Sequence, residues 1–283
     1  DETVDLVVVG SGIAGLCATM EAHEQGLNVT LVEQMGLLGG YSGFTGFLVG
    51  ANTKAQAKEG LTGTYEQVVE RFNYQDQLLD PGLTNAESIA YMIEESGPTI
   101  DWLLDMGAQL WNVTWQDDIH HYANGENHLA GNTIVPTLHK KLDENQVDCR
   151  LNTRATELLM EGESVVGVQA ETKDGQAYNI HAKGVALCTG GYFANPEMVE
   201  KYKPEFRNFT RTTGSKGADG SGMMMAAAAG AELAYMDQGS ALPYMLIQRN
   251  GIPMTAPSGW MRARGGILVN LEGKRVSDEN APY

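Results

Sequence analysis

Residues 5–33 read DLVVVGSGIAGLCATMEAHEQGLNVTLVE, and this stretch decides the fold. The apolar run from Leu6 to Val9 predicts a buried parallel strand, and the residues after the glycine-rich turn predict a helix to about Gln25. A second apolar run then ends at Glu33. Strand, helix and strand in this order predict a βαβ unit.

The turn between the first strand and the helix has the spacing GxGxxG, made by Gly10, Gly12 and Gly15. Gly10 permits the tight turn, Gly12 lets a pyrophosphate approach the backbone at the helix N-terminus, and Gly15 lets helix and strand pack closely. Ala14 belongs to the same turn and to the predicted cofactor site. Glu33 lies where a carboxylate can accept hydrogen bonds from ribose hydroxyls. The glycine spacing alone is weak evidence, but all these features together predict dinucleotide binding.

The composition limits the classes of partner. The chain has 283 residues and a formal net charge of −17, which repels phosphate backbones and argues against nucleic acid. No apolar window is long enough to cross a membrane, so we predict no membrane span. The three cysteines, Cys17, Cys149 and Cys188, lack metal-ligand spacing, so we predict neither structural zinc nor an iron–sulfur cluster in these residues.

A second glycine-rich segment, QMGLLGGYSGFTGFLVGANT, occupies residues 34–53. Because glycine has no side chain, backbone amides in such a segment can lie close to a flat or anionic ligand. The predicted cofactor contacts here come from Gln34, Gly39, Gly40, Ser42, Gly43 and Gly46.

At this segment the chain resembles the FAD-dependent family that includes soluble fumarate reductases, urocanate reductases and 3-ketosteroid dehydrogenases. Members carry a Glu-x-x…Gly-Gly-x-Ser segment along the pyrophosphate and isoalloxazine, and Glu33, Gly39, Gly40 and Ser42 match it. The resemblance implies that the cofactor is FAD. It continues at IDWLLDMGAQL, residues 100–110, which is similar to a family helix that ends in a Met-Gly-Ala turn.

Residues 150–195 alternate apolar and polar residues and contain a Lys-Asp-Gly turn, which predicts short antiparallel strands. The resemblance implies an adenine contact from the backbone of Ala155 and a second flavin-side turn. That turn consists of Thr189, Gly190 and Gly191. Asp219, in GADGSG before a small-residue helix MMMAAAAGAEL, matches a turn that contacts the ribityl side of the flavin.

The predicted fold class is α/β. We expect a Rossmann-like FAD-binding domain with a β-meander insertion over residues 1–238, followed by the start of an α+β cap domain over residues 239–283. In the family, a glycine-rich segment after the cap returns to close the flavin site. We expect that segment outside these residues.

In fumarate reductases the cap holds a substrate histidine, a Glu and Arg proton relay, and a catalytic arginine. The resemblance places Leu242 at the histidine, Gly259 near the relay glutamate and Tyr283 at the catalytic arginine. Arg262 matches the relay arginine. A pocket without those cationic groups is poorly suited to a dicarboxylate, because carboxylates select bidentate Arg and charged donors.

The terminal stretch EGKRVSDENAPY is similar instead to a segment of 3-ketosteroid dehydrogenases. There, the tyrosine exchanges a proton with the carbon next to the one that trades a hydride with flavin N5. Val276 and Asp278 depart from the usual Phe and Asn. The predicted catalytic residues are therefore Tyr283 and Arg262.

We expect hydride transfer from reduced FAD to a C=C bond conjugated to a carbonyl, in an apolar enone or unsaturated lactone such as a steroid. Three alternatives stay open: a 3-ketosteroid dehydrogenase acting oxidatively, a fumarate- or urocanate-type reductase of a small unsaturated acid, and a flavin electron-transfer protein without a substrate. The electron donor, a haem, FMN or iron–sulfur module or a reduced carrier, is expected outside these residues. The chain is expected either in a bacterial cytoplasm or exported with a removed leader.

Residues 115–132 contain His120, His121 and His128 in a Gly/Asn-rich sequence that predicts a loop. The helical i, i+4 spacing typical of metal-binding histidines is absent, so we predict no metal. In the family this loop runs over the flavin. Tyr122, His128 and, in the cap, Leu242 are therefore the candidate substrate contacts.

Overall fold

The computed structural model describes all residues except 47, 80–84, 116–118, 124–128, 209–213, 240–244, 248–252, 256–265, 268 and 277–283. For residues 73–79, 112–115, 119–123, 245–247 and 253–255 the backbone alone is described. The chain divides into two compact units, and each is described by itself. Unit 1 comprises Asp1–Gly190 and Ser221–Gly230, and unit 2 comprises Gly191–Gly220 and Ala231–Tyr283.

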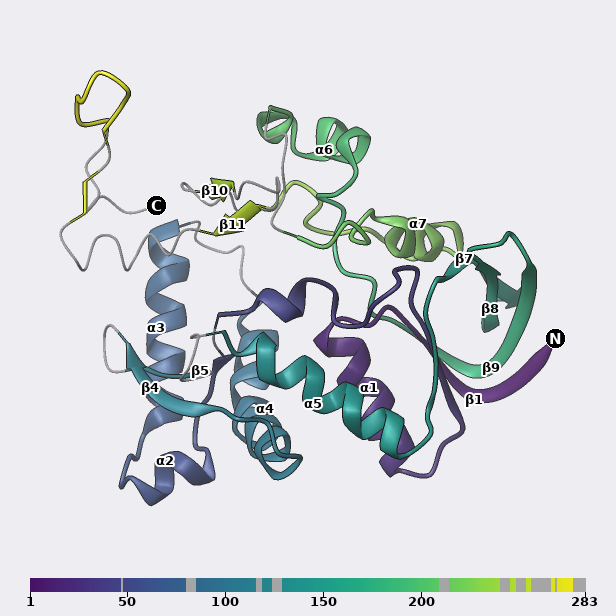
Figure 1. Ribbon diagram of the computed structural model, residues 1–283, viewed down its shortest axis with the longest axis horizontal. Coiled ribbons are helices and arrows are strands. Elements are labelled where there is room, and N and C mark those ends of the chain that lie inside the picture. Colours follow the sequence, from purple (N-terminus) through teal and green to yellow (C-terminus); the bar gives the residue numbers. More distant parts are fainter. Residues whose placement is uncertain are drawn as a thin grey trace. The chain divides into compact units, whose positions relative to one another are not determined.

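A six-stranded sheet with the order β6-β2-β1-β9-β8-β7 forms the centre of unit 1 (Figure 1). Its parallel part is made by β6 (Asp148–Arg150), β2 (Val29–Val32), β1 (Glu2–Val9) and β9 (Ala177–Leu187). The strand β1 lies between β2 and β9, and its residues from Val7 to Val9 are buried. An apolar strand enclosed on both faces is typical of parallel sheets, which confirms the predicted βαβ unit.

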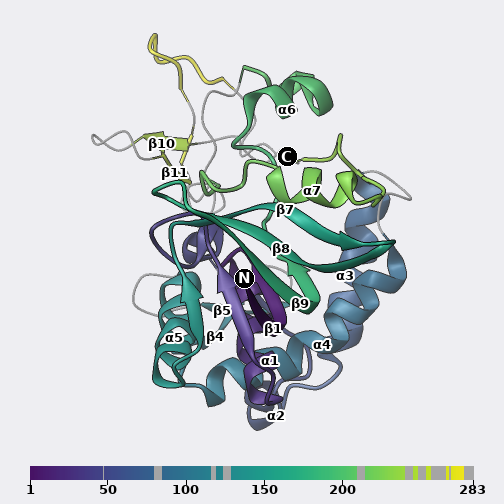
Figure 2. The ribbon, with the colours of Figure 1, turned by 90° about the vertical axis from the view of Figure 1, so that its right-hand side faces the viewer.

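An antiparallel meander extends the sheet beyond β9 (Figure 2). It consists of β7 (Thr153–Glu161), β8 (Ser164–Thr172) and β9 itself. The predicted Lys-Asp-Gly turn joins β8 to β9, where Gly175 has φ +82° and its N–H donates to the Thr172 carbonyl at 2.9 Å. The α/β fold with a Rossmann-like sheet and a β-meander is therefore confirmed.

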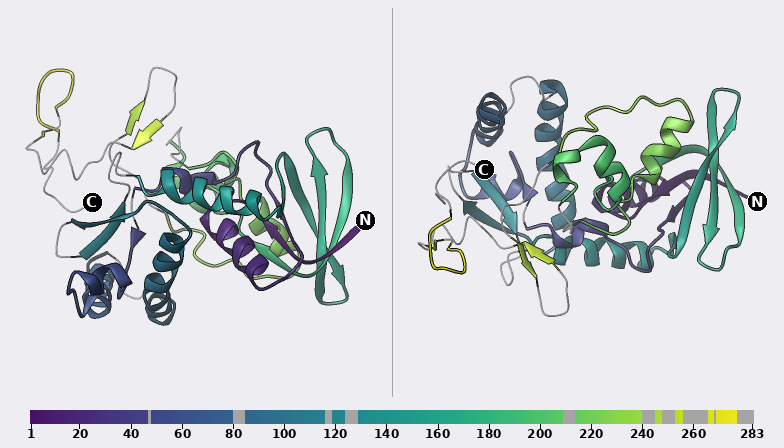
Figure 3. Two further views of the ribbon diagram at one scale, coloured as in Figure 1. Left: turned by 60° about the horizontal axis from the view of Figure 1, so that its bottom comes forward. Right: turned by 90° about the horizontal axis from the view of Figure 1, so that it is seen from above.

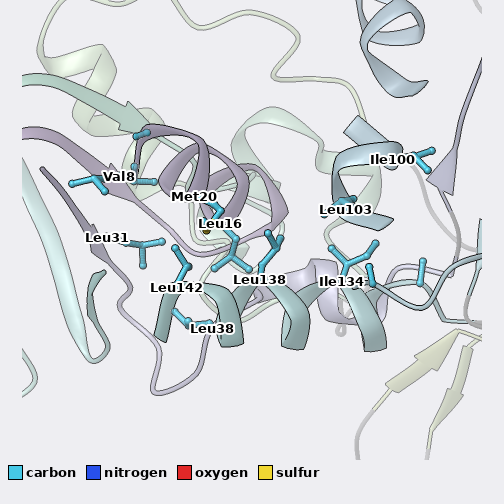
Figure 4. Packing of buried hydrophobic residues seen from close by; sticks show 14 of the residues in the cluster. Val8, Leu16, Met20, Leu31, Leu38, Ile100, Leu103, Ile134, Leu138 and Leu142 are labelled. Carbon is cyan, nitrogen blue, oxygen red and sulfur yellow. The ribbon is translucent and has the colours of Figure 1, made fainter. Parts of the chain in front are cut away.

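Two helices pack side by side on one face of the sheet: α1 (Ile13–Glu24) and α5 (Gly131–Glu144). Ile134, Leu138 and Leu142 recur every four residues, so they form one apolar stripe of α5, and each is at most 1% exposed. Figure 4 shows this stripe packed with Leu16 and Met20 of α1 in one core. This core fixes the start of α1 against the end of β1.

The helix α7 (Ser221–Ala228) belongs to a second core, in which Met225 packs with residues of β1, β7, β8 and β9. Met224 is 43% exposed, so the methionine run is only partly in the core. The sequence predicted a longer helix, through Leu233. The helix ends earlier because Gly230 adopts φ +98°, a left-handed conformation that terminates helices.

A helical and β-hairpin region completes unit 1. Its helices are η1 (Gly40–Phe44), α2 (Lys54–Lys58), α3 (Thr64–Leu79) and α4 (Ala86–Asp105), and its strands are β3 (Leu48–Val49), β4 (Trp111–Trp115) and β5 (Ile119–Ala123). The Asn85 side chain caps α4 by accepting a hydrogen bond from the Ser88 N–H at 2.9 Å. As predicted, α4 ends directly before the Met-Gly-Ala turn, in which Gly107 has φ +102°.

The predicted loop around the histidines was wrong in part. His120, His121 and Tyr122 lie in β5, which pairs with β4 and β3 in an antiparallel sheet. The β-branched and aromatic residues in both hairpin arms favour this pairing over a loop. His128 lies outside the described residues. No group of three or more His, Cys, Asp or Glu side chains suited to a metal ion occurs in the part of the chain that the structure describes.

Unit 2 contains α6 (Pro196–Tyr202), η2 (Pro204–Phe206) and a hairpin of β10 (Met245–Ile247) and β11 (Pro253–Thr255) (Figure 3). An aromatic cluster centres on Tyr192, whose ring stacks on that of Phe193 with centroids 4.9 Å apart. The predicted domain boundary after residue 238 stays a prediction, because the two units alternate along the chain. Among the described helices, none is both long and apolar enough to cross a membrane.

The half-buried cysteine Cys17 should react slowly with thiol reagents. Burial, with a smaller contribution from Cys188, raises the pKa of Cys17 from 9.0 to about 11. Because the thiolate reacts, Ellman's reagent at pH 8 should modify Cys17 on the order of 100-fold more slowly in the native than in the denatured protein. Above about pH 9 the unfolded thiol ionises while the folded thiol stays neutral, so stability should fall as pH rises. Equal rates of Cys17 modification in the native and the denatured protein would contradict the raised pKa.

Candidate functional site

The GxGxxG turn joins β1 to α1 as predicted, and two of its glycines are required by the protein itself. Gly10 has φ +97°, and a Cβ there would lie 2.5 Å from the Cys188 carbonyl oxygen. A Cβ on Gly15 would lie 1.9 Å from the Gly10 carbonyl oxygen. These distances are far below van der Waals contact, so a side chain at either position would force the turn, the helix and the end of β9 apart.

Gly12 is different, because neither its backbone conformation nor its packing requires glycine. Its φ of −59° and ψ of 174° are open to any residue. A Cβ there would meet Ser42 Oγ at 3.7 Å, an ordinary contact, and a Cβ on Gly43 or Gly46 would meet no protein atom within 4 Å. Gly39 and Gly40 have positive φ, which turns the chain back towards Gly12. The two glycine segments thus leave bare backbone facing the helix N-terminus, which fits a ligand that approaches the backbone closely.

The N-terminus of α1 is held by a side chain from η1. The Ile13 N–H donates to Ser42 Oγ at 2.9 Å, whereas the N-cap residue, Gly12, has no side chain to do so. The adjoining Ala14 lies in the first turn of the same helix. Free N–H groups and the positive end of the helix dipole favour an anion at such a terminus. The predicted pyrophosphate fits this position.

Glu33 directly follows β2, as predicted, and its side chain is only 7% exposed. Its Oε2 accepts hydrogen bonds from the Ser11 N–H at 2.9 Å and from Ser11 Oγ at 2.6 Å. Its Oε1 accepts one from the Met35 N–H at 2.7 Å. A carboxylate has about four acceptor positions, so Glu33 keeps capacity for a further donor such as a ribose hydroxyl. The ribose contact itself stays a prediction.

Ser11 is a residue that the sequence reasoning missed. It is 0% exposed, and besides binding Glu33 its carbonyl oxygen accepts a hydrogen bond from the Gly39 N–H at 2.9 Å. Ser11 therefore connects the glycine turn, the acid and the second glycine segment. It occupies a variable position of the motif, and the one signal for its role is a hydroxyl at a turn position buried between glycines.

Replacing Ser11 by alanine should weaken FAD binding about 10-fold, because it removes a hydrogen bond to a buried carboxylate, worth roughly 1.5–3 kcal/mol, while Glu33 Oε2 keeps the backbone donor. Titration of the flavin-free protein with FAD measures the effect. Ser88→Ala, a change of an exposed serine on α4, is the control and should leave affinity unchanged. Wild-type affinity in Ser11→Ala would show that Ser11 does not position the acid.

The start of β7 lies against the segment that contains Glu33. The Thr153 N–H donates to the Glu33 carbonyl at 2.9 Å, and the Asn152 N–H donates to the Met35 carbonyl at 3.0 Å. Since β7 is the last strand of the sheet and N–H directions repeat every two residues, the Ala155 N–H points to the same side as that of Thr153. The adenine contact itself stays a prediction.

The predicted second flavin-side turn follows β9. Within unit 1, Thr189 packs against the first turn of α7, where a Cβ on Gly222 would meet Thr189 Oγ1 at 2.1 Å. Gly190 has φ +73°. Gly191 and Asp219 belong to unit 2, in which the Gly220 N–H donates to the Gly191 carbonyl at 3.1 Å and Asn195 Nδ2 donates to the Asp219 carbonyl at 3.1 Å.

Four of the five predicted catalytic and substrate residues lie outside the described part of the chain: His128, Leu242, Arg262 and Tyr283. Gly259, the position near the family's relay glutamate, also lies outside it. The backbone of the fifth residue, Tyr122, pairs with Leu48 of β3. The roles of these five residues stay predictions.

Comparison with known proteins agrees with this architecture. Residues 5–283 match a family model described as an FAD binding domain. Over 98% of the chain, a fumarate reductase (cytochrome) of Shewanella frigidimarina is 32% identical, as is a urocanate reductase of Eggerthella lenta. The chain covers 48% of the former and 46% of the latter, and thus spans about half the length of these curated relatives.

Solved structures share the fold. The open conformation of a flavocytochrome c3 fumarate reductase superimposes with a TM-score of 0.87 at 28% identity, covering 100% of this chain and 49% of that one. A 3-ketosteroid-Δ4-(5α)-dehydrogenase from Rhodococcus jostii RHA1 gives 0.69 at 24% identity, covering 84% and 56%. Because the family model matches almost the whole sequence, the chain belongs to the FAD binding domain family and its cofactor is FAD.

Proposed function

We propose that the chain is the flavin-binding part of an oxidoreductase that reduces a carbon–carbon double bond conjugated to a carbonyl group. The observation that carries this proposal is the family match over residues 5–283, together with relatives named as fumarate and urocanate reductases. Both of those substrates contain a double bond next to a carboxyl group. The bare backbone beside the α1 N-terminus supports the same cofactor-dependent chemistry.

We assign the FAD-binding roles from the family resemblance, and the geometry within unit 1 supports the first two of them. The N-terminus of α1 would hold the pyrophosphate, Glu33 would accept from the ribose, and the Ala155 backbone would meet the adenine. The resemblance assigns contacts on the flavin side to Thr189, Gly190, Gly191 and Asp219. When bound, FAD would supply the hydride. Its electrons would come from a haem, FMN or iron–sulfur module or from a reduced carrier outside these residues.

The substrate is an apolar enone or unsaturated lactone. Leu242, Gly259 and Tyr283 stand where the resemblance to fumarate reductases expects groups that hold a dicarboxylate and move its proton. Without cationic partners, the cost of removing a carboxylate from water would not be offset by ion pairs in the pocket. Tyr283 donates a proton to the α carbon, and Arg262 acts as a nearby relay or electrostatic group. A phenol suits this role because it delivers a proton without a permanent buried charge.

A small unsaturated acid is the second candidate substrate. The names of the 32% identical relatives favour it, because they act on fumarate and urocanate. Such a substrate requires cationic partners, and Leu242, Gly259 and Tyr283 carry none, so the cations would come from other residues of the protein.

The test is an anaerobic stopped-flow experiment on the full-length flavoprotein with chemically reduced FAD. Fumarate, urocanate and 4-androstene-3,17-dione are added in turn, and flavin reoxidation is followed by absorbance. We expect the steroid enone to reoxidise the flavin faster than either acid. Faster reoxidation by fumarate or urocanate selects the second candidate. If no alkene reoxidises the flavin, the protein transfers electrons without a substrate of this class.

A further inference from the structure

Arg154 is a cation at the predicted adenine end of the FAD site, and neither the motif nor the family resemblance assigns it a role. It is exposed and directly precedes Ala155 on β7. Its Nη1 donates to Gln34 Oε1 at 2.9 Å. Gln34 in turn directly follows Glu33, the predicted ribose acid. The hydrogen bond therefore joins the two chain segments that flank the predicted adenosine.

The backbone fixes this pair in place. The Thr153 and Asn152 N–H groups donate to the carbonyls of Glu33 and Met35, so the two segments run side by side where Arg154 meets Gln34. The Gln34 amide oxygen orients the guanidinium of Arg154. A guanidinium held at one edge loses less rotamer freedom when a ligand binds.

We propose that Arg154, oriented by Gln34, forms the outer wall of the adenine site and makes the chain select adenine-containing FAD over FMN. The inference rests on the proposed FAD-binding roles of Glu33 and Ala155. A planar, delocalised guanidinium stacks on the face of a base, while the Ala155 N–H meets the base edge. Arg154 is thus a specificity-determining residue for the cofactor.

A purely structural role is the competing explanation. The register of β7 and β8 places Glu171 opposite Arg154, and such cross-strand charge pairs stabilise sheets modestly. That role would affect folding stability and all ligands equally. The adenine role affects only ligands that contain adenine, so binding of half-ligands separates the two.

The experiment measures dissociation constants of FAD, ADP and FMN with the flavin-free full-length protein. Flavin fluorescence quenching reports FAD and FMN, and displacement of FAD reports ADP. Arg154→Ala should raise the constants of FAD and ADP about 10-fold and leave that of FMN within about twofold. Gln34→Ala should act in the same direction, about threefold, because Arg154 then loses its anchor. Arg154→Lys keeps the charge but not the plane, and should stay impaired.

Two matched controls test the competing role. Glu171→Gln removes the cross-strand charge, and Lys173→Ala removes an exposed cation at the β8–β9 turn. Both should bind FAD and ADP like the wild type. If Arg154→Ala binds FAD and ADP within about twofold of wild type, or weakens FMN as much as FAD, the proposal is overturned. If FMN binds too weakly to measure, the dissociation constant of ADP alone tests the proposal. Failure of the wild type to bind FAD would instead refute the proposed function.

Discussion

Replacing Tyr283 by phenylalanine should lower the rate of substrate reduction by about 10²–10⁴-fold, the usual contribution of a positioned general acid. Phenylalanine keeps the ring and removes only the hydroxyl, so packing is preserved while the proton donor is lost. FAD content should stay unchanged, because the predicted cofactor contacts lie elsewhere in the sequence. Anaerobic stopped-flow reoxidation of the reduced flavin measures the step directly.

Tyr91→Phe is the matched control for this prediction. Tyr91 lies on α4, is 67% exposed and undergoes the same chemical change, so its variant should turn over like the wild type. A Tyr283→Phe enzyme with near-wild-type rates would mean that the proton comes from another residue or from water. An enzyme that loses FAD along with activity would mean that Tyr283 supports the fold rather than the reaction.

The sequence predicts the nucleotide-binding half of unit 1 well because local and long-range requirements coincide there. The run Leu6–Val9 is apolar because a parallel strand is enclosed on both faces, and Glu33 directly follows β2, at the position where the motif predicts a ribose-binding acid. The meander was predicted equally well, since apolar and polar residues alternate along its strands and its turn contains Gly175, which has a left-handed conformation. Such features involve residues that are close together in the sequence, so local patterns predict them.

The sequence reasoning failed for three separate reasons. The strand β5 was expected to be a loop because of the Gly/Asn-rich residues around it, whereas its β-branched and aromatic residues pair with the neighbouring strand β4, and its edge pairs with β3, where His121 lies opposite Val49. The end of α7 was misplaced because alanines favour helix and the left-handed Gly230 overrides them. The hydrogen bond from Ser11 to Glu33 joins the two ends of the βαβ unit, and the pattern of apolar and polar residues does not predict a side-chain hydrogen bond of that kind.

Replacement by alanine should impair folding at Gly15 but only FAD binding at Gly12, although both glycines belong to one motif. In Gly15→Ala the new Cβ would lie 1.9 Å from the Gly10 carbonyl oxygen and 3.2 Å from Cys188 Cβ. The clash is with backbone, which cannot rotate away, so we expect a loss of roughly 3 kcal/mol or more in the free energy of unfolding. Flavin should be lost with the fold. Urea unfolding and flavin absorbance measure both effects.

Gly12→Ala should instead fold normally and bind FAD about 10²-fold more weakly. Its backbone conformation accepts alanine, and the new Cβ would lie 3.7 Å from Ser42 Oγ. The methyl group would, however, occupy the close approach of the pyrophosphate and cost one or two charge-assisted hydrogen bonds of roughly 1.5–3 kcal/mol each. Gly184→Ala on β9, with a Cβ 3.7 Å from Leu6 Cδ1, is the control for alanine at an open glycine. Wild-type FAD affinity in Gly12→Ala would place the pyrophosphate away from this helix terminus, and unfolding of Gly12→Ala would show that the glycine serves packing after all.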